Sequence, residues 1–557
     1  MMELNISKFK ELLQRIDGMS YSMYRKLRNL VVNYDMAKII FTKVQSDPHA
    51  PPSIVEVIIP SKVHRSSIKF LRPKSQIPFT DYIARILYRV TKKFSKRCGS
   101  GYSCYIGIPK PSPRILKRSC VEVENGDIIL RMYIGLPARN RRILGDKARE
   151  LFIRNIPGIM DVIITTLHSK VDEIEEHIKC YIDQEYLRQW LYKNNYMFFI
   201  ADGSILPRES SLSEKPMKNA TPFRSPQALR LVVRLPSDKQ ITGMAIPRGV
   251  VVITGGGYHG KTTLLKAIQD GIYNHIRSDG REYVISRKYT IVVKAEDGRI
   301  VSNVDISSFI NNLPTGEDTS RYSSLNSSGS TSMAASINEA IEANAEVILI
   351  DEDTSATNLL FKDEVMSKII TKEPIKPLHT QIRDFVNKTK IGVVIITSAS
   401  SSFLDVADKV ILVESYVPRD ITTDIRRYIA PKSELPYKFP RSREFHGIRG
   451  LRKIRAKDYK IVTEYSDGTR FELDLTYYSR IVEKGQVKLI VCIVKKLANL
   501  ERPMSIPELI NYVNELISNK GFSAFIHPVP PDLTTVDGFD VVWVLNRLYN
   551  AVFIQSK

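Results

Sequence analysis

Short hydrophobic runs alternate with helical patterns through the middle of the chain. Val250–Thr254 is a β-branched apolar run, which predicts a buried parallel strand. Leu264, Leu265, Ile268 and Ile272 then recur at steps of three and four residues and predict a helix. Similar apolar runs predict strands at Leu229–Leu235, Tyr289–Lys294, Val347–Ile350, Gly392–Thr397 and Ala407–Val413. Strands that alternate with helices are typical of a mainly parallel sheet, so we expect an α/β fold here.

The flanks of this α/β region carry mixed patterns, which predict α+β domains. On the N-terminal side they predict strands at Ser53–Ile59 and Asp127–Ile134 and helices at Tyr82–Phe94 and from Glu150 to Trp190. On the C-terminal side they predict a hairpin around Asp467 and helices at Val487–Leu497, Ile506–Ile517 and Val541–Val552. Two polar stretches, Gly135–Ile143 and residues 311–332, are expected to be loops.

Changes in composition set the expected domain boundaries. A polar passage rich in Ser and Pro ends near Phe223, and a basic stretch with little apolar periodicity begins at Pro431. We therefore expect an N-terminal α+β domain at residues 1–215 and an α/β core at 216–430. A basic linker and a small α+β domain are expected to fill residues 431–557.

The charge of the chain changes this picture most. The 557 residues include 82 Lys or Arg against 60 Asp or Glu, a formal net charge of +22. Such a chain attracts polyanions, although a general bias toward basic residues is the alternative. No apolar run is long enough to cross a membrane, and five scattered cysteines without a C-x-x-C pair fit a reducing cytosol. We therefore expect a soluble, cytoplasmic protein with no membrane partner.

The stretch from Thr91 to Val121 contains no Asp or Glu. Tyr102 and Tyr105 are interleaved with its basic residues. Basic side chains that follow phosphates and rings that stack on bases are what binding of single-stranded nucleic acid requires. A solvated basic face is the alternative. The candidate nucleic-acid contacts are Lys92, Lys93, Lys96, Arg97, Tyr102, Arg114, Lys117 and Arg118.

A glycine-rich motif lies between the predicted strand and helix: Gly255–Thr262 matches G-x-x-x-x-G-K-[ST]. Backbone N–H groups and the positive end of a helix dipole converge there, which suits a triphosphate. Lys261 would reach the β- and γ-phosphates, and the Thr262 hydroxyl would bind Mg²⁺. The alternative is a glycine-rich turn that matches the motif by chance. We expect instead a nucleotide site with ATP and Mg²⁺ as cofactors. The expected nucleotide contacts are Gly255, Gly256, Gly257, Tyr258, His259, Gly260, Lys261, Thr262 and Thr263.

Two carboxylates, Asp351 and Glu352, follow the predicted strand Val347–Ile350. In a P-loop enzyme the first carboxylate holds Mg²⁺ and the second polarises the attacking water. A buried strand that ends in an acidic turn is the alternative. Because a parallel sheet brings the carboxyl ends of its strands to one edge, we expect both carboxylates near Lys261.

Together these motifs resemble the ABC class of P-loop ATPases. Over nearly its whole length the chain is similar to a family of predicted ABC-class ATPases that are not transporters. The resemblance implies an ABC-type P-loop core that hydrolyses ATP, and we expect RNA or another nucleic acid as partner. It rests on Gln45–Ser53, Gly135–Ile143, Asp202–Arg208, Gly255–Leu265, Ala295–Arg299, Asp305–Pro314, Ser328–Ala335 and Ile350–Asn358.

Within the wider class, Ser327–Thr331 corresponds to the signature loop and Ser355–Asn358 to the D-loop. Thr331 lies 20 residues before Asp351, the separation that the class shows. The resemblance implies that two nucleotide domains stack head to tail, as a homodimer. Each ATP is then held between the P-loop of one subunit and the signature of the other. The signature residues expected to contact ATP are Ser328, Gly329 and Ser330.

Two positions depart from ABC transporters. Ser398 stands where transporters carry a switch histidine, and a serine cannot carry a proton's charge near neutral pH. With Glu352 and Lys261, Ser398 completes the candidate catalytic set. No clear Q-loop glutamine is present, and Glu296 is the nearest candidate to contact Mg²⁺ or water. His259 could act as a substitute sensor or have a structural role.

Three functions remain open from the sequence. The first is an ATPase that hydrolyses ATP between two copies and couples hydrolysis to binding of nucleic acid, with single-stranded RNA favoured over DNA. The second is a P-loop enzyme of small-molecule chemistry, which would not need a signature loop. The third is the ATPase subunit of a membrane transporter, which the large flanking domains disfavour.

Overall fold

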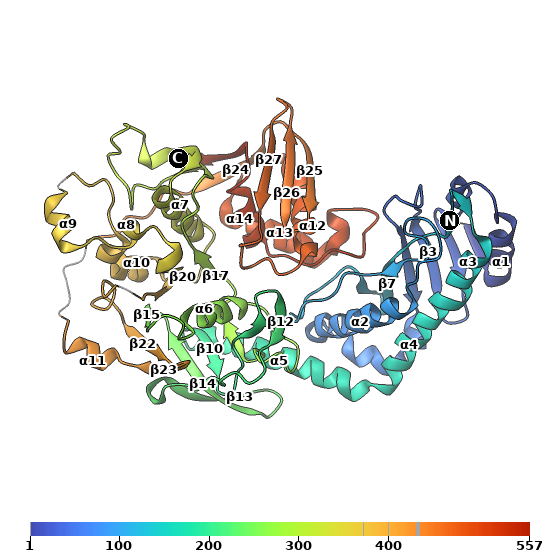
Figure 1. The fold of residues 1–557 in the computed structure, drawn as a ribbon, viewed down its shortest axis with the longest axis horizontal. Helices are drawn as coiled ribbons and strands as arrows, with labels where there is room; N and C mark the ends of the chain where they lie inside the picture. The colour runs from blue at the N-terminus through green and yellow to red at the C-terminus, as the bar shows by residue number, and fades with distance from the viewer. Residues whose placement is uncertain (1, 371, 399, 430–434, 557) are drawn as a thin grey trace. The chain divides into compact units, whose positions relative to one another are not determined.

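The computed structural model describes residues 2–370, 372–398, 400–429 and 435–556 (Figure 1). The chain forms two compact units. Unit 1 comprises Met1–Ile182 with the later segments Glu483–Leu489 and Lys520–Thr535, and unit 2 comprises the rest. The C-terminal part of the chain therefore contributes to both units. The expected domain boundaries at residues 215 and 430 are boundaries between independently folding domains. They are not tested by this division into units and stay a prediction.

Unit 1 is built on a seven-stranded sheet of order β1-β2-β3-β4-β7-β5, with β6 paired to β7. Helices pack on it through one core, in which Phe9, Phe41 and Phe152 have no solvent exposure. Its strands are β1 Met2–Asn5, β2 Leu30–Asn33, β3 Lys38–Lys43, β4 Ser53–Ile59, β5 Ile106–Gly107, β6 Val121–Glu124 and β7 Asp127–Ile134. Its helices are α1 Ile6–Arg15, α2 Pro73–Phe94, α3 Gly145–Arg149 and α4 Ile156–Ser169, and α5 Val171–Lys193 continues into unit 2.

Unit 2 contains a six-stranded sheet of order β17-β20-β21-β15-β22-β23. Every pair is parallel except β22–β23, which confirms the mainly parallel sheet predicted from the hydrophobic runs. The strands are β15 Val250–Thr254, β17 Thr290–Val293, β20 Val347–Asp351, β21 Gly392–Ile396, β22 Lys409–Glu414 and β23 Val417–Asp420. Helices of this unit include α6 Lys261–Asp270, α7 Gly329–Glu342, α8 Thr357–Leu360, α9 Glu364–Ile369, α10 Ile382–Thr389 and α11 Thr422–Arg426.

A second, antiparallel sheet in unit 2 has the order β13-β14-β10-β16. Its strands are β10 Tyr196–Ala201, β13 Arg230–Arg234, β14 Gln240–Pro247 and β16 Val284–Ser286. A short hairpin, β11 Arg208–Ser210 with β12 Ser213–Pro216, lies between β10 and β13 in the chain. The buried side chains of β14 and β10 join those of β15 and α6 in one hydrophobic core.

Two predicted loops are wrong in part. Within residues 311–332, β19 Tyr322–Ser327 pairs with β18 Arg299–Val304, and α7 already begins at Gly329. Half of the residues in this strand are exposed and most are polar, so composition alone suggested a loop. Gly135–Ile143 likewise contains a small hairpin, β8 Ala138–Arg139 with β9 Arg142–Ile143.

The predicted basic linker is also wrong from Arg443 onward. Its residues form β24 Arg443–Ile448 and β25 Leu451–Lys457, whereas residues 430–434 lie outside the described part of the chain. The predicted hairpin is β26 Lys460–Tyr465 with β27 Arg470–Asp474. The remaining elements are α12 Lys484–Leu497, β28 Met504–Ser505, α13 Ile506–Lys520, α14 Gly538–Leu545 and β29 Ala551–Gln555. The last predicted helix, Val541–Val552, therefore ends at Leu545, and its final two residues belong to β29.

Across the part of the chain that the structure describes, no helix is both long and apolar enough to cross a membrane.

Candidate nucleotide site

The P-loop connects β15 to α6, and two of its glycines have conformations or surroundings that a side chain would disturb. Gly255 has φ +145°, and a Cβ there would lie 2.2 Å from the carbonyl oxygen of Val413. Gly260 has φ +97° and caps the N-terminus of α6. These conformations are strained for residues other than glycine. The loop therefore folds tightly and presents the first turn of α6 to a ligand.

Lys261 is 6% exposed, and its Nζ donates to the carbonyl oxygens of Gly255 and Gly256 at 2.6 and 2.7 Å. The ammonium group therefore lies along the loop rather than in solvent. Phosphate oxygens would make stronger, charge-assisted hydrogen bonds with this ammonium group than neutral carbonyls do. Lys261 is thus held beside the place where a phosphate group would bind.

A cavity of about 810 Å³ adjoins the P-loop within unit 2. This volume lies within the range of small-molecule and cofactor sites. It is lined by Gly257–Leu264 of the P-loop and α6, and its lining also includes the apolar residues Leu206, Met217 and Phe223. Asp353, Ser398 and Tyr416 also line it. The cavity therefore has a phosphate-binding end and a partly apolar end.

The two carboxylates lie at the end of β20, as the sequence predicted, and β21 lies between β20 and β15. Asp351 is 6% exposed, and burial raises the pKa of its carboxyl group above the ordinary value. The charge of Glu352 adds to this increase, whereas Lys261 opposes it. Asp351 therefore lies close enough to both Glu352 and Lys261 to feel their charges.

Glu352 is held by the segment that follows β21. Its Oε2 atom accepts hydrogen bonds from the Thr397 hydroxyl at 2.6 Å and from the Ser398 N–H at 3.2 Å. Ser398 thus acts here through its backbone, and its side chain is exposed. The sequence analysis did not single out Thr397. Thr397 could be found only from the parallel register of the sheet. The register pairs Asp351 with Ile396, so the residues that follow them, Glu352 and Thr397, lie side by side.

The oxygen donors near the P-loop suit Mg²⁺. The carboxylate of Asp351 accepts one backbone hydrogen bond, from Asp353 at 3.3 Å, and the exposed Thr262 lines the cavity. Mg²⁺ prefers oxygen ligands and keeps waters or phosphate oxygens in its remaining positions. Among the described residues no cluster of three or more His, Cys, Asp or Glu could hold a metal ion.

Glu296 forms an ion pair with Arg547, and its role as a contact of Mg²⁺ or water stays a prediction. Both of its carboxylate oxygens accept from the guanidinium of Arg547, at 3.0 and 2.6 Å. Burial alone would raise the pKa of Glu296, but Arg547 lowers it to about 2. A contact of Glu296 with Mg²⁺ or water would therefore share the carboxylate with Arg547. His259 has a structural contact, since its Nδ1 accepts from the Ser415 N–H at 3.0 Å.

The signature segment forms the start of α7, with Ser328 as N-cap. Ser330 donates to the side chain of Asn358 in the D-loop segment at 2.8 Å, so the two segments are joined. A Cβ on Gly329 would lie 3.1 Å from the Asp297 side chain. Among the described residues that line the P-loop cavity, none belongs to Ser328–Ser330. One copy of the chain therefore does not bring the signature to its own cavity.

The acid-free stretch 91–121 is less basic in space than in sequence. Lys92, Lys93, Lys96 and Arg97 are exposed, and Tyr102 is 45% exposed. Arg118 is buried and forms ion pairs with Asp81 and Glu483, which rules it out as a free phosphate contact in this fold. Lys117 lies over the ring of Phe522, and Arg114 also has other interactions. The candidate nucleic-acid contacts that remain exposed are thus Lys92, Lys93, Lys96, Arg97 and Tyr102.

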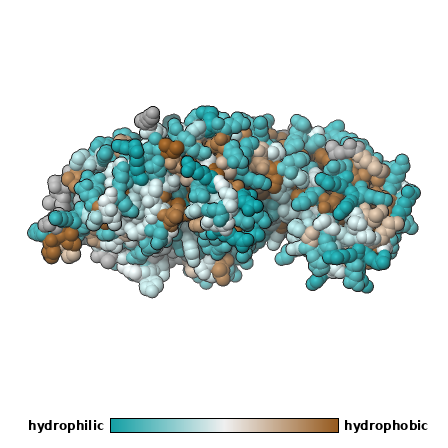
Figure 2. All heavy atoms as spheres, turned by 90° about the horizontal axis from the view of Figure 1, so that it is seen from above, coloured by the Kyte–Doolittle hydropathy of each residue, from teal (hydrophilic) through white to brown (hydrophobic). Residues whose placement is uncertain are grey.

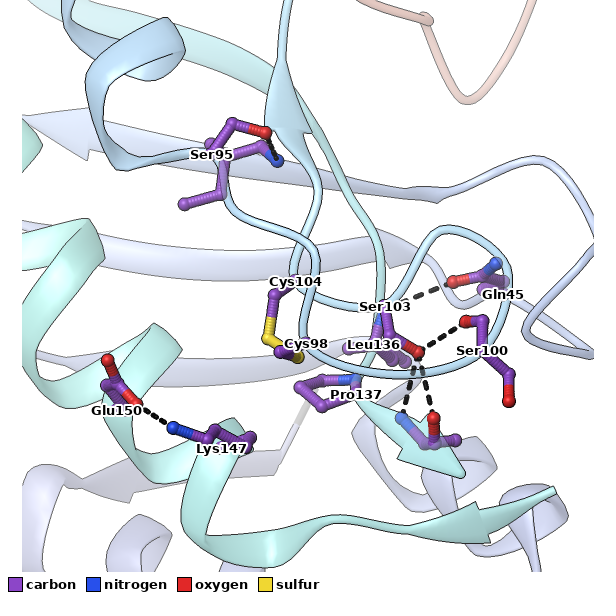
Figure 3. The surroundings of a disulfide bond; sticks show 12 residues. Gln45, Ser95, Cys98, Ser100, Ser103, Cys104, Leu136, Pro137, Lys147 and Glu150 are labelled. Carbon is purple, nitrogen blue, oxygen red and sulfur yellow. Dashed lines mark hydrogen bonds and ion pairs between the residues drawn. A yellow bond between two sulfur atoms is a disulfide. The ribbon is translucent and has the colours of Figure 1, made fainter. Parts of the chain in front are cut away.

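A disulfide between Cys98 and Cys104 closes the loop that follows α2 (Figure 3). Beside it, the Ser103 hydroxyl donates to the Ser100 carbonyl oxygen at 2.6 Å. The sequence did not predict this pair, because its cysteines are scattered and odd in number. Disulfides persist mainly in oxidising compartments, so this bond does not support the expected reducing cytosol. The cytoplasmic location stays a prediction.

The central sheet, the P-loop, the adjoining carboxylates and the capped signature helix together define a P-loop ATPase domain of the ABC class. Residues 170–449 match the family described as the ABC_ATPase P-loop domain, and residues 6–166 match the N-terminal domain of ATPases of the ABC class. The chain belongs to this family of ABC-class ATPases.

A curated relative and a solved structure also match. The uncharacterized protein MJ1628 of Methanocaldococcus jannaschii is 29% identical over 370 residues, which cover 62% of this chain and 76% of the relative. An ATP-binding cassette of an ABC transporter, solved in its ADP conformation, is 12% identical with a TM-score of 0.23. That match covers 36% of this chain and 92% of the cassette.

Proposed function

We propose that this protein hydrolyses ATP in a Mg²⁺-dependent reaction at the cavity beside the P-loop. The observation that carries the proposal is the pairing of strand ends around β21, with Lys261 after β15 on one side and Glu352 after β20 on the other. Lys261 and Thr262 would bind the phosphates and Mg²⁺, with Asp351 as a further metal contact. Glu352 would act as the base for the attacking water.

Two copies of the chain are proposed to enclose each ATP. The signature does not line the cavity of its own chain, so its exposed Ser328 is available to a second copy. After the D-loop segment, α9 exposes Val365, Met366 and Ile369 by 62, 45 and 66%. Figure 2 shows a hydrophobic group at the left end, where Figure 1 places α9. Exposed apolar groups of this kind favour a contact with another protein surface.

Single-stranded nucleic acid, with RNA favoured over DNA, is the proposed partner. On unit 1 the exposed residues Lys92, Lys93, Lys96 and Arg97 lie near the exposed ring of Tyr102 in sequence. On unit 2, β25 is an edge strand, and Arg452, Lys453, Arg455 and Lys457 on it are all exposed. Lysines also protect edge strands against aggregation, so binding must be measured. Phosphate contacts by such side chains would make the affinity fall with salt.

Two variants test the hydrolysis. Lys261→Ala removes a phosphate contact and should weaken both nucleotide binding and turnover. Glu352→Gln keeps the shape of the side chain but removes the base, so ATP should bind and persist while turnover falls about a hundredfold or more. Lys266→Ala is the matched control, because this lysine lies on the same helix but is exposed. Turnover by Glu352→Gln at the wild-type rate would exclude the proposed base.

A further inference from the structure

The end of β21 occupies a central place between the two halves of the nucleotide site. The parallel register pairs Ile396 of β21 with Asp351 on one side and with Ile253 of β15 on the other. The next residue, Thr397, donates its backbone N–H to the Ile253 carbonyl oxygen at 3.0 Å. Its backbone is therefore fixed to the strand that leads into the P-loop, and its side chain reaches Glu352.

The contacts of the Thr397 hydroxyl determine where its single proton goes. Its Oγ1 lies 2.6 Å from Glu352 Oε2 and 2.8 Å from the Ser400 carbonyl oxygen, and both of these atoms accept. A hydroxyl has only one proton to donate. A hydrogen bond to an ionised carboxylate is the stronger of the two, and this contact is also the shorter. The hydroxyl therefore donates to Glu352, while its lone pair can accept from the Ser400 N–H at 3.3 Å.

We propose that Thr397 is a positioning residue that orients the carboxylate of Glu352 for hydrolysis. The inference rests on the proposed function, in which Glu352 is the base. Thr397 is 2% exposed, so water does not readily replace its hydroxyl. With the Ser398 N–H as second donor, it fixes Oε2 and leaves Oε1 for the attacking water. The segment after β21 thereby acts through a neutral hydroxyl and a backbone N–H, with no charge change near neutral pH.

The first test replaces the hydroxyl while keeping the shape. Thr397→Val should lower kcat for ATP about tenfold to a hundredfold, because small misplacements of a reacting group have effects of this size. The KM for ATP and the affinity for a non-hydrolysable analogue should change less than about twofold. Thr397→Ser restores the donor and should recover kcat to within about threefold of wild type. Thr389→Val is the control, since it removes a part-buried threonine hydroxyl from α10.

A double-mutant cycle separates positioning from a structural role. In the Glu352→Gln background, Thr397→Val should change the residual single-turnover rate less than about twofold, because the group it orients is already lost. If Thr397→Val lowers that residual rate by the same factor as in wild type, the proposal is overturned. If a lowered thermal midpoint shows that Thr397→Val is unstable, Thr397→Ala replaces it in the cycle. The proposal is then overturned if Thr397→Ala lowers the rate by the same factor in wild type and in Glu352→Gln.

The two proposals fail in different ways. Turnover by Glu352→Gln at the wild-type rate would overturn the assignment of the base, and with it this inference. Loss of turnover in Glu352→Gln with normal kcat in Thr397→Val would overturn only the role of Thr397. A fall in kcat with unchanged KM and rescue by Thr397→Ser would support it.

Discussion

Arg118 is the residue of the acid-free stretch whose replacement should most affect stability. Its guanidinium Nη2 lies 2.5 Å from Glu483, and Nη1 contacts Asp81. Asp81 also accepts from Arg85 at 2.8 Å and lies 3.1 Å from His177. All five residues belong to unit 1, and the carboxyl group of Asp81 has no solvent exposure. Arg118 thus joins helix α2 to the segment that returns from near the C-terminus.

The expected loss of stability in Arg118→Met can be worked out from the pKa of the Glu483 carboxylate. Burial alone would raise the pKa of Glu483, yet Arg118, together with hydrogen bonds from Ser112 and Thr534, lowers it from 4.5 to about 2. At about 1.4 kcal/mol per pKa unit, this depression corresponds to about 3 kcal/mol. Because the folded pKa is the lower one, the stabilisation is complete above pH 4.5 and is lost as the pH falls toward 2. Arg118→Met leaves both carboxylates without this partner, which should cost about 3–5 kcal/mol.

Hydrogen exchange under native conditions measures the effect within unit 1. Arg118→Met should speed exchange of the core amides of β4 and β7 by the factor that this loss implies, and it should lower the urea midpoint of unit 1. Lys93→Met is the control, an exposed lysine whose loss should change stability by less than about 0.5 kcal/mol. Adding Glu483→Gln to Arg118→Met should recover part of the loss. Protection in Arg118→Met equal to that in Lys93→Met would refute the reasoning.

Two further predictions concern partners. Glu352→Gln with ATP should form a dimer in size exclusion with light scattering, and adding Ser328→Arg should leave it monomeric, because a bulky cation blocks the facing site. A dimer that persists with Ser328→Arg would show that the signature residues are misassigned. For single-stranded RNA, the log–log salt slope should change by about 0.7 per phosphate contact removed. The slope should flatten when a set of four exposed cations is replaced by glutamine. One set lies on unit 1, at Lys92, Lys93, Lys96 and Arg97, and the other on unit 2, at Arg452, Lys453, Arg455 and Lys457. An unchanged slope and affinity would exclude that set as a contact.

Local patterns were sufficient for most of the nucleotide core. β4, β7 and β15 have the bounds that their apolar runs predicted, because each strand is buried on a sheet and its pattern is continuous. The P-loop and the Asp351–Glu352 pair were found from spacing. Their motifs require particular residue types at fixed positions, some for the backbone conformation and some for the chemistry, so they can be recognised in the sequence. The fold class could therefore be predicted from sequence alone.

Features that depend on distant partners could not be predicted in this way. Thr397 is an ordinary strand-end threonine until the register places it beside Glu352. Arg443 looked like part of a basic linker, but it is fully buried and forms an ion pair with Glu342 at 2.5 Å. β19 was missed because its sequence is mostly polar and lacks the hydrophobic alternation that predicts a strand.

The basic residues are the clearest case of such distant partners, because acids far away in the sequence can neutralise them in the folded chain. The stretch from Thr91 to Val121 has no acid of its own, yet Asp81 and Glu483 neutralise Arg118. Lys96 lies near enough to Glu150 to help lower that group's pKa. Lys92, Lys93 and Arg97, by contrast, form no ion pair with any residue that the structure describes, nor do the four cations of β25. Lys92, Lys93 and Arg97 on unit 1 and the four cations of β25 on unit 2 are therefore two exposed strips that could attract a phosphate backbone, and we expect them to contribute to a salt-dependent affinity.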